Sequence, residues 1–379
     1  KHPSFPQLVC ELETFRGCPR TSHCSFCSER FKKVTYQRSI AGIIAEVGAL
    51  AALGNTCFRL GAQTDLLLFQ AIRENGKLVP NPGAIEELYA GIRKAAPRLK
   101  VLHMDNINPA TIADFPRESA LALGIIAKYN TPGDTAAFGL ESADPEVLRA
   151  NNIGTDVEKT FRAIEIMNEV GGWRQEGIPK LLPGLNFLHG LRGESKRTMD
   201  LNLEFLRRVR DAGLLVRRIN IRQVNPLGSY KLRKDIASAY RFQQYKDAVN
   251  KEINKPMLQK VFPLGTLYRD VIIEESEGLT AYGRQPGTYP ILVGIPGKFP
   301  VGSSLEVKIV DHGYRSITGL PWPLKISGAS MEQLAALPGI GKNRARKIFL
   351  AKGIDSMEKL QQLLPDANLM GLEDYVSFD

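Results

Sequence analysis

Short apolar runs alternate with amphipathic helical stretches along the first 230 residues of the chain. The apolar runs predict six β-strands, over residues 8–13, 57–60, 101–104, 136–140, 184–188 and 216–221. Apolar positions at helical spacing predict helices over residues 40–53, 84–95, 112–120, 157–170 and 198–212. Strands that alternate with helices of this length form parallel βαβ units, so the pattern predicts an α/β layer or barrel. In such folds the functional side chains gather at the carboxyl ends of the strands.

The pattern changes after residue 230. A polar helical stretch over residues 236–254 comes first, and the last segment, from residue 330, is helical again. Between them, β-rich runs separated by Gly and Pro predict a small β-barrel, with strands over residues 267–274, 279–282, 291–293 and 305–310. We therefore expect four parts, an α/β core, a helical linker, a β-barrel and a helical module, over residues 1–232, 233–265, 266–328 and 329–379.

The composition narrows the class of protein. Of 379 residues, 43% are hydrophobic, which suffices for packed cores, and no apolar run approaches the ~18 residues of a membrane span. The chain starts with Lys1 and a strand-like segment follows at once, so we expect a processed or trimmed form that lacks an N-terminal region. No secretory signal is visible in the sequence. Five cysteines, an odd number, argue against a disulfide framework and favour a reducing, cytoplasmic location.

Positive charge is concentrated in two places. The net charge is +10, and residues 201–250 hold eleven Lys or Arg against four Asp or Glu. The first cluster comprises Arg207, Arg208, Arg210, Arg217, Arg218 and Arg222, and the second comprises Lys342, Arg344, Arg346 and Lys347. Either cluster alone could be a solvated helix face. Together they favour a polyanionic partner, and nucleic acid first.

Three cysteines, Cys18, Cys24 and Cys27, lie within ten residues directly after the first predicted strand. Three thiolates from one loop can hold three irons of a [4Fe-4S] cluster and leave the fourth iron open to a substrate-like ligand. Zinc is an alternative, although a structural zinc site needs four ligands and the nearest fourth candidate, His23, adjoins Cys24. Buried inert thiols are the third reading. Cys10 and Cys57 lie in apolar runs, which indicates core packing.

The cysteine loop resembles the signature of the radical S-adenosylmethionine (SAM) superfamily. In that family three cysteines follow the first strand of a partial (β/α)6 barrel, and an aromatic residue precedes the last cysteine, as Phe26 does here. The spacing departs from the family's usual CxxxCxxC, because two extra residues separate Cys18 from Cys24. The resemblance implies a partial barrel of this kind, a [4Fe-4S] cluster on the three cysteines, and SAM as second cofactor.

The resemblance also implies SAM contacts at successive strand ends, and suitable groups follow the predicted strands in order. The candidate cofactor-binding residues are Phe26, Gly61, Ala62, Gln63, His103, Glu141, Ser142, Asn186 and Gly190. Asp105, Glu141 and His189 are candidates to orient the substrate in catalysis. Each has a structural alternative: Gly190 could simply turn the chain, and Glu141 could cap a helix.

Residues 334–348, with a Pro-Gly-Ile-Gly-Lys turn, resemble a helix-hairpin-helix. Gly339 and Gly341 would let a phosphate approach the backbone N–H groups of the second helix, and Lys342 and Arg344 would add charge. A tight helical connector is the alternative. The preceding β-rich segment resembles the TRAM domain, an OB-like barrel found in radical SAM tRNA methylthiotransferases.

Together these parts resemble an archaeal family of tRNA-modifying radical SAM enzymes, with the radical SAM partners of archaeosine synthase as the most similar group. The resemblance implies a C–N lyase that uses a 5′-deoxyadenosyl radical to convert a lysine-bearing 7-deazaguanine of tRNA into archaeosine. It further implies tRNA, an electron donor and an archaeosine synthase as partners. One alternative is a methylthiotransferase, which needs three further cysteines for a second cluster where only Cys10 and Cys57 remain. The other is a non-catalytic zinc module that binds tRNA.

Overall fold

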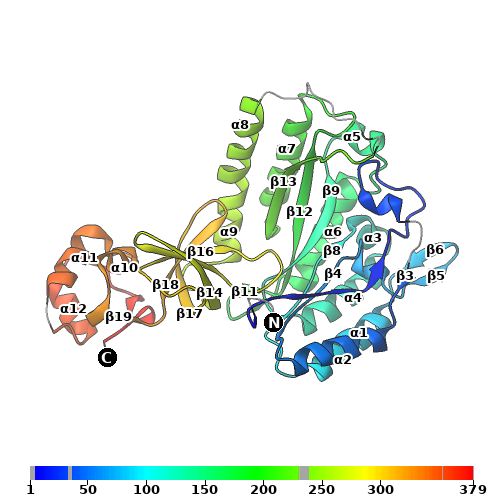
Figure 1. Ribbon diagram of the computed structural model, residues 1–379. Coiled ribbons are helices and arrows are strands. Elements are labelled where there is room, and N and C mark those ends of the chain that lie inside the picture. The colour runs from blue at the N-terminus through cyan, green and yellow to red at the C-terminus, as the bar shows by residue number, and fades with distance from the viewer. Residues whose placement is uncertain (1–4, 33–35, 229, 231–238, 352, 379) are drawn as a thin grey trace. The chain divides into compact units, whose positions relative to one another are not determined.

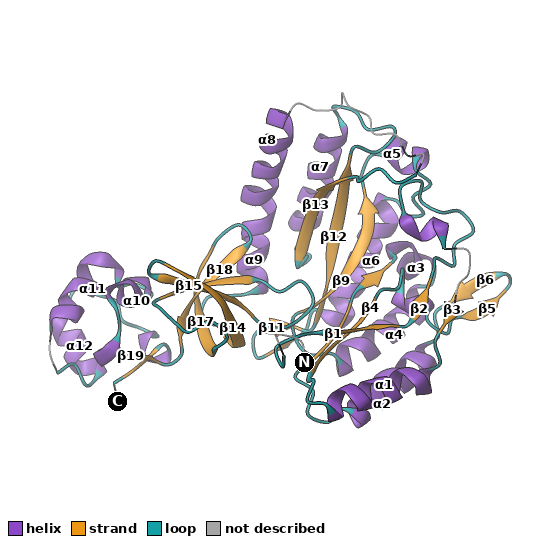
Figure 2. Ribbon diagram, in the orientation of Figure 1, coloured by secondary structure: helices purple, strands orange, loops and turns teal. Residues whose placement is uncertain are grey.

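The computed structural model describes residues 5–32, 36–228, 230, 239–351 and 353–378 and divides into two compact units (Figures 1 and 2). The first unit is Lys1–Met257 together with Gly287–Tyr289, and the second is Leu258–Pro286 with Pro290–Asp379. The four-part division predicted from the sequence is finer than these two units and stays a prediction. None of the described helices is long and apolar enough to cross a membrane.

The first unit is built on parallel strands in two sheets. One sheet has the order β1 (Cys10–Glu13), β4 (Cys57–Gly61), β7 (Val101–Met104). The other has the order β13 (Arg218–Gln223), β12 (Leu181–His189), β9 (Asp134–Glu141), β8 (Asn106–Ile107). A single residue, Asp105, separates β7 from β8, so the two sheets follow one another around an incomplete barrel with β1 and β13 at its edges. All six predicted strands are present, and the mixed α/β fold expected from the sequence is confirmed.

Seven helices connect the strands in the described part of this unit up to residue 228: α1 (Ile40–Ala52), α2 (Pro82–Ala95), α3 (Pro109–Asp114), α4 (Pro116–Tyr129), α5 (Pro145–Ala150), α6 (Val157–Gly171) and α7 (Thr198–Asp211). Polar caps start several of them; the Ser39 side chain, for example, accepts a hydrogen bond from the Gly42 N–H at the start of α1. The prediction of one helix over residues 112–120 is wrong. Pro116 cannot continue α3, so the chain ends one helix and begins another there.

Side-chain alternation along the strands gives the first unit its core. Phe58, Leu60, Phe138 and Phe187 are among the strand residues that pack with the helices in one large apolar cluster. Because successive strand side chains point to opposite faces, their neighbours line the inside of the barrel. The inside of the barrel is therefore where polar strand residues collect.

The second unit contains a closed barrel in the order β14-β15-β16-β18-β17. Its strands are β14 (Leu267–Glu277), β15 (Thr280–Arg284), β16 (Leu292–Pro296), β17 (Ser304–His312) and β18 (Ser316–Pro321). A small barrel was expected here, but the sequence pattern missed β18, whose Gly319 and Pro321 are typical of loops. Gly319 is required in the strand because a Cβ there would lie 2.7 Å from Val307 Cγ2.

Helices flank this barrel in the chain. Before it come α8 (Ala239–Val249), a π-helical turn (Asn250–Asn254) and α9 (Lys255–Val261). The helical prediction over residues 236–254 agrees with these elements, except that residues 236–238 lie outside the described residues. After the barrel come α10 (Met331–Ala336), α11 (Gly341–Leu350) and α12 (Met357–Leu363), which share their own apolar core.

The remaining elements are short. Four antiparallel or parallel pairs of strands are β2 (Phe15–Arg16) with β3 (Tyr36–Gln37), β5 (Ile72–Glu74) with β6 (Lys77–Val79), β10 (Arg174–Gln175) with β11 (Ile178–Pro179), and β19 (Leu324–Lys325) with β20 (Val376–Ser377). Single turns of 3-10 helix cover Ser28–Phe31, Leu66–Leu68, Ile326–Gly328 and Leu372–Asp374.

Candidate functional site

A cavity of about 380 Å³ opens at the carboxyl ends of the strands of the first unit, where α/β folds bind their ligands. The cysteine loop forms one side of it, and the ends of β4, β8, β9 and β12 form the other. Of the predicted site residues, those that line the cavity are Cys18, Cys24, Phe26, Cys27, Ala62, Gln63, Glu141 and Asn186. The structure thus brings together residues spread over 169 positions of sequence, from Cys18 to Asn186.

The cysteine loop is fixed by polar contacts. Ser25 donates hydrogen bonds from its N–H to the Asn151 carbonyl at 2.9 Å and from Oγ to Asn151 Oδ1 at 2.8 Å. Cys27 N–H donates to the Cys24 carbonyl at 3.2 Å. Burial raises the pKa of the Cys24 and Cys27 thiols, and the Arg20 guanidinium, 3.5 Å from Cys24 Sγ, opposes this shift at Cys24. Metal binding must therefore displace protons from these thiols.

The three cysteines fit an iron–sulfur cluster. Within the described ranges, no set of three or more His, Cys, Asp or Glu side chains converges as the ligands of one metal ion do. A [4Fe-4S] cluster binds each thiolate to a different iron, so its ligands stand apart around a shared space, as Cys18, Cys24 and Cys27 do around this cavity. The fourth zinc ligand considered from the sequence, His23, has its ring Nε2 3.3 Å from the Cys18 carbonyl oxygen, where it ties the loop to itself.

The turn after β4 supplies the next part of the wall. Ala62 has a positive φ of 59°, and Gln63 and Asp65 are buried beside it. Asp65 accepts hydrogen bonds from Thr111 Oγ1 at 2.6 Å and from the Leu67 N–H at 3.2 Å, yet burial raises the pKa of this carboxyl to about 7. Gly61 does not line the cavity; a side chain there would overlap the Glu11 carboxylate, which would have to move aside.

Asp65 predicts a pH dependence of stability in the protein without bound ligand. Because its pKa in the folded protein lies at about 7, above the ordinary 3.8, the folded state gives up stability as the pH rises from about 4 to 7. We expect Asp65→Asn to be more stable than wild type by about 2–4 kcal/mol at pH 8 and equal to it at pH 4. Urea unfolding of the two proteins across this range checks it, and parallel pH profiles would contradict it.

Glu141 and Asn186 lie at the ends of β9 and β12. Glu141 holds a φ of 65°, which costs free energy in a non-glycine residue and persists only where the surroundings impose it. Burial raises its pKa to about 8, against the lowering effect of Arg222. Asn186 Oδ1 accepts a hydrogen bond from Asn220 Nδ2 at 3.1 Å. Near neutral pH this wall therefore offers a protonated carboxyl and an amide to a polar ligand.

Two predicted residues near these strand ends hold the backbone instead. Ser142 is buried, and its Oγ accepts a hydrogen bond from the Asp144 N–H at 3.1 Å at the start of α5. Gly190 has a φ of 88° and donates its N–H to the Glu194 carboxylate, in line with the alternative that it turns the chain.

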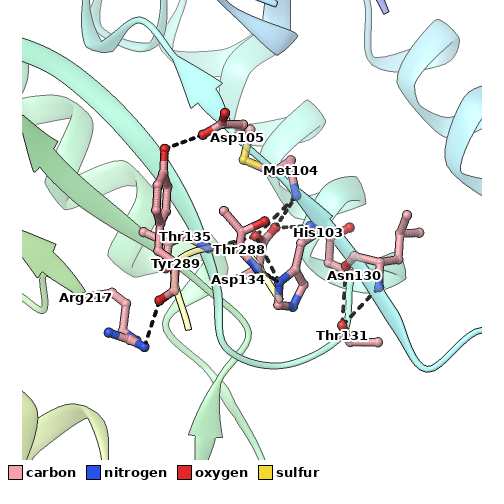
Figure 3. Close-up of polar contacts among 11 residues, drawn as sticks. His103, Met104, Asp105, Asn130, Thr131, Asp134, Thr135, Arg217, Thr288 and Tyr289 are labelled. Carbon is pink, nitrogen blue, oxygen red and sulfur yellow. Dashed lines mark hydrogen bonds and ion pairs between the residues drawn. The ribbon is translucent and has the colours of Figure 1, made fainter. Parts of the chain in front are cut away.

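The structure does not bring the other two catalytic candidates and His103 to the cavity. His189 lies on the face of β12 opposite Asn186, with Nδ1 2.6 Å from Glu194 Oε1 and its ring against Phe242 and Tyr245. The expectation that it orients a substrate is corrected by this placement. His103 and Asp105 point into the barrel and contact Thr288 and Tyr289 rather than the cavity (Figure 3).

The first cluster of arginines is not one open patch. On α7, Arg207 pairs with Glu252 at 2.7 Å, Arg208 with Glu158 at 2.5 Å, and Arg210 with Asp211 at 2.7 Å. Arg217 is buried, and the guanidinium of Arg218 lies 3.9 Å from the centre of the Tyr289 ring. Carboxylates, the interior of the fold or the Tyr289 ring thus engage all five arginines expected to bind RNA in this cluster.

The turn between α10 and α11 has the backbone that its glycines predict. Gly339 and Gly341 have φ values of 76° and 63°. Arg344 donates to the Gly339 carbonyl at 2.8 Å and to the Asp366 carbonyl at 3.1 Å, so its guanidinium braces the turn. Lys342 and Lys347 border a shallow hollow at the start of α11.

Sequence reasoning missed Arg20. This residue belongs to the two-residue expansion between Cys18 and Cys24, and its guanidinium reaches Cys24 and the Asn152 carbonyl at 3.3 Å. A side chain at Gly154 would overlap it, so the glycine makes room for the arginine. The longer spacing between Cys18 and Cys24 could have pointed to Arg20, because extra residues in a loop that carries ligands lie close to the site.

Known proteins resemble this chain in sequence. The family model described as "Radical SAM superfamily" matches residues 12–206. An uncharacterized protein of Archaeoglobus fulgidus is 40% identical over 369 residues, which cover 96% of this chain and 68% of the relative. An uncharacterized protein of Methanocaldococcus jannaschii is 46% identical over 333 residues, covering 84% of this chain and 61% of the relative. The chain thus spans about two thirds of the length of these relatives.

Solved structures give weaker matches. Methylornithine synthase matches with a TM-score of 0.39 and 16% identity, covering 68% of this chain and 69% of that one. The radical SAM methyltransferase TsrM from Kitasatospora setae matches with a TM-score of 0.39 and 19% identity, covering 54% and 34%. On the family match and the archaeal relatives, the chain belongs to the radical SAM superfamily, whose cofactors are the [4Fe-4S] cluster and SAM expected from its cysteine loop.

Proposed function

We propose that this chain is a radical SAM enzyme that cleaves a C–N bond of a lysine-bearing 7-deazaguanine in tRNA to form archaeosine. The observation that supports its chemistry is the convergence of three thiols, a strained glutamate and an asparagine on one cavity. The substrate part of the proposal rests on the sequence resemblance and on the two modules of the second unit. An archaeosine synthase and an electron donor are proposed as partners on the same resemblance.

In this proposal Cys18, Cys24 and Cys27 hold the [4Fe-4S] cluster, and the rest of the cavity holds SAM. Together the two cofactors supply one-electron chemistry that removes a hydrogen atom from a substrate carbon. The chain's own contribution is to orient and to exclude water. Phe26, Leu68, Ile107 and Ile153 give the cavity apolar walls that exclude water from a reactive centre.

Polar groups in the cavity orient the bound molecules. The turn at Ala62 and Gln63 presents backbone to the SAM amino acid end, and Asn186 presents its amide from the end of β12. Glu141, with a pKa raised to about 8, carries a proton over much of the neutral range and can donate a hydrogen bond. Of the three residues considered for a lysine-like substituent, Glu141 is the one that lines the cavity.

The modules of the second unit suit tRNA. OB-like barrels have five strands and bind oligonucleotides across their second and third strands, which here are β15 and β16. At the α10–α11 turn, N–H groups at the start of a ten-residue helix, with Lys342 and Lys347 beside them, are suited to a phosphate. Phosphate contacts of this kind would position a large RNA without reading its sequence.

The test is anaerobic reconstitution with iron and sulfide, followed by dithionite, SAM and bulk archaeal tRNA that lacks archaeosine. Mass spectrometry reads 5′-deoxyadenosine and the modified nucleosides. We expect deoxyadenosine together with loss of the lysine-bearing deazaguanine. Deoxyadenosine without a change in that nucleoside would contradict the substrate and retain the SAM chemistry, and binding of tRNA without any deoxyadenosine would favour the zinc module.

A further inference from the structure

A short segment far along the chain belongs to the barrel of the first unit. Gly287–Tyr289 joins this unit although about 30 residues of the second unit precede it. Thr288 donates its backbone N–H to His103 Nδ1 at 2.9 Å, and the Tyr289 hydroxyl donates to Asp105 Oδ1 at 2.5 Å. Figure 3 shows the Tyr289 phenol pointing toward the Asp105 carboxylate.

The residues of Gly287–Tyr289 fit the close approach to His103. A Cβ on Gly287 would lie 2.9 Å from His103 Cε1, so only glycine lets the backbone come this close. Burial lowers the pKa of His103 to about 3, so the ring is neutral and its Nδ1 lone pair can accept the Thr288 N–H. His103, which was predicted as a cofactor contact, therefore binds the segment Gly287–Tyr289 instead.

Tyr289 is held in a strained conformation by contacts on three sides. Its φ is 51°, in the left-handed region that costs free energy for an aromatic residue. Arg217 Nη2 donates to its carbonyl at 3.3 Å, and the Arg218 guanidinium covers its ring at 3.9 Å. Burial, with Asp105 adding to it, raises the pKa of the phenol, so Tyr289 stays a hydrogen-bond donor at every working pH. Backbone strain that is held by several contacts is a signature of functional positions.

Asp105 connects this contact to the cavity. It is the single residue between β7 and β8, and its carbonyl accepts the Ala137 N–H at 2.9 Å. The next residue, Asn106, donates from Nδ2 to the Gln63 carbonyl at 3.3 Å. Ala137, Asn106 and Gln63 all line the cavity that the cysteines border. A contact that holds Asp105 in place therefore also helps to hold Ala137, Asn106 and Gln63 in the cavity wall.

We propose that Tyr289 is a positioning residue for SAM: its hydroxyl holds the Asp105 carboxylate and so fixes the wall formed by Asn106, Ala137 and Gln63. The proposal rests on the SAM site and is independent of the tRNA substrate. Removing the hydroxyl leaves the phenyl ring and its packing but releases Asp105, so the wall is no longer held in the geometry that binds SAM.

The test compares Tyr289→Phe with Tyr129→Phe. The control removes a hydrogen bond of the same kind and length, because the Tyr129 hydroxyl donates to Glu86 Oε1 at 2.5 Å, away from the cavity. Calorimetric titration of the reconstituted full chain gives the dissociation constant for SAM. We expect Tyr289→Phe to raise it about 5- to 20-fold and Tyr129→Phe to leave it within about twofold. In the protein without cofactors, hydrogen exchange of the Ala137 amide is expected to accelerate only in Tyr289→Phe.

Asp105→Ala, alone and combined with Tyr289→Phe, removes the acceptor of the same hydrogen bond without altering the tyrosine. If the two residues act through the same hydrogen bond, the dissociation constant for SAM of the double variant equals that of the single variant with the larger effect. Unchanged SAM affinity in Tyr289→Phe, additive losses in the double variant, or an equal loss in Tyr129→Phe would each overturn the proposal. Since SAM binding needs no RNA, failure of the tRNA assay leaves these outcomes readable.

Discussion

Replacing Cys24 by alanine is expected to abolish SAM cleavage by the reconstituted protein. Cys24 is one of three cysteines at the cavity, and the other two described cysteines lie elsewhere: Cys57 is buried, and Cys10 packs against the core from β1. No spare thiol of the described chain can therefore replace it at the site. Iron analysis, absorbance of the cluster and mass spectrometry of 5′-deoxyadenosine measure the effect, with about four irons per chain expected for wild type.

Cys10→Ala is the matched control for that experiment. It removes a half-buried thiol from the neighbouring strand while leaving the cavity intact, so iron content and SAM cleavage are expected to stay at the wild-type level. Cleavage retained by Cys24→Ala with an intact iron signal would overturn the ligand assignment. About eight irons per chain in the wild-type protein would instead point to a second cluster and to the methylthiotransferase alternative.

Phe138→Ala is expected to destabilise the first unit by about 3–5 kcal/mol. The ring is fully buried in the main core, on the face of β9 that packs against the helices. Its chain neighbours Ala137 and Gly139 line the cavity on the opposite face of the strand, so collapse around the missing ring would also shift the cavity wall.

Chemical denaturation followed by circular dichroism measures this loss of stability. Phe138→Leu serves as the control, because it keeps most of the apolar volume and is expected to cost less than half as much. If the alanine variant lost less than about 1 kcal/mol of stability, the core would relax fully into the space left by the ring, which would contradict the close packing around Phe138.

The strands and most helices of the first unit could be predicted because their signals are local. Each apolar run is flanked by turn residues, and strands that are buried on both faces read as continuous apolar runs in the sequence. Elements whose signals conflict were mispredicted. Pro116 lies inside a helical apolar pattern and divides it, and β18 carries glycine and proline because Gly319 must pass within van der Waals distance of Val307.

Site residues that are close together in the sequence were predicted, and those whose contacts come from distant parts of the sequence were missed. Cys18, Cys24 and Cys27 share one loop, so their spacing is enough to predict them as ligands of one cluster. The environment of Asp105, by contrast, is set by Tyr289, which lies 184 positions away. Arg207 looked like part of a basic surface, but Glu252 on another helical segment pairs with it. No local pattern can report such pairings, because they depend on which helices become neighbours.

The tie between Ser25 and Asn151 bears on how the enzyme is assembled. Asn151 Oδ1 also receives the Tyr230 hydroxyl at 3.0 Å, and Asn151 Nδ2 donates to the Arg192 carbonyl at 2.8 Å, so the cysteine loop is anchored to a polar hub in the folded barrel. Small zinc domains gain their fold from the metal, and chelators unfold them. A loop held in place by protein contacts has no such dependence. We therefore expect the chain to stay folded without the cluster, so that removing and rebuilding the cluster needs no unfolding of the protein.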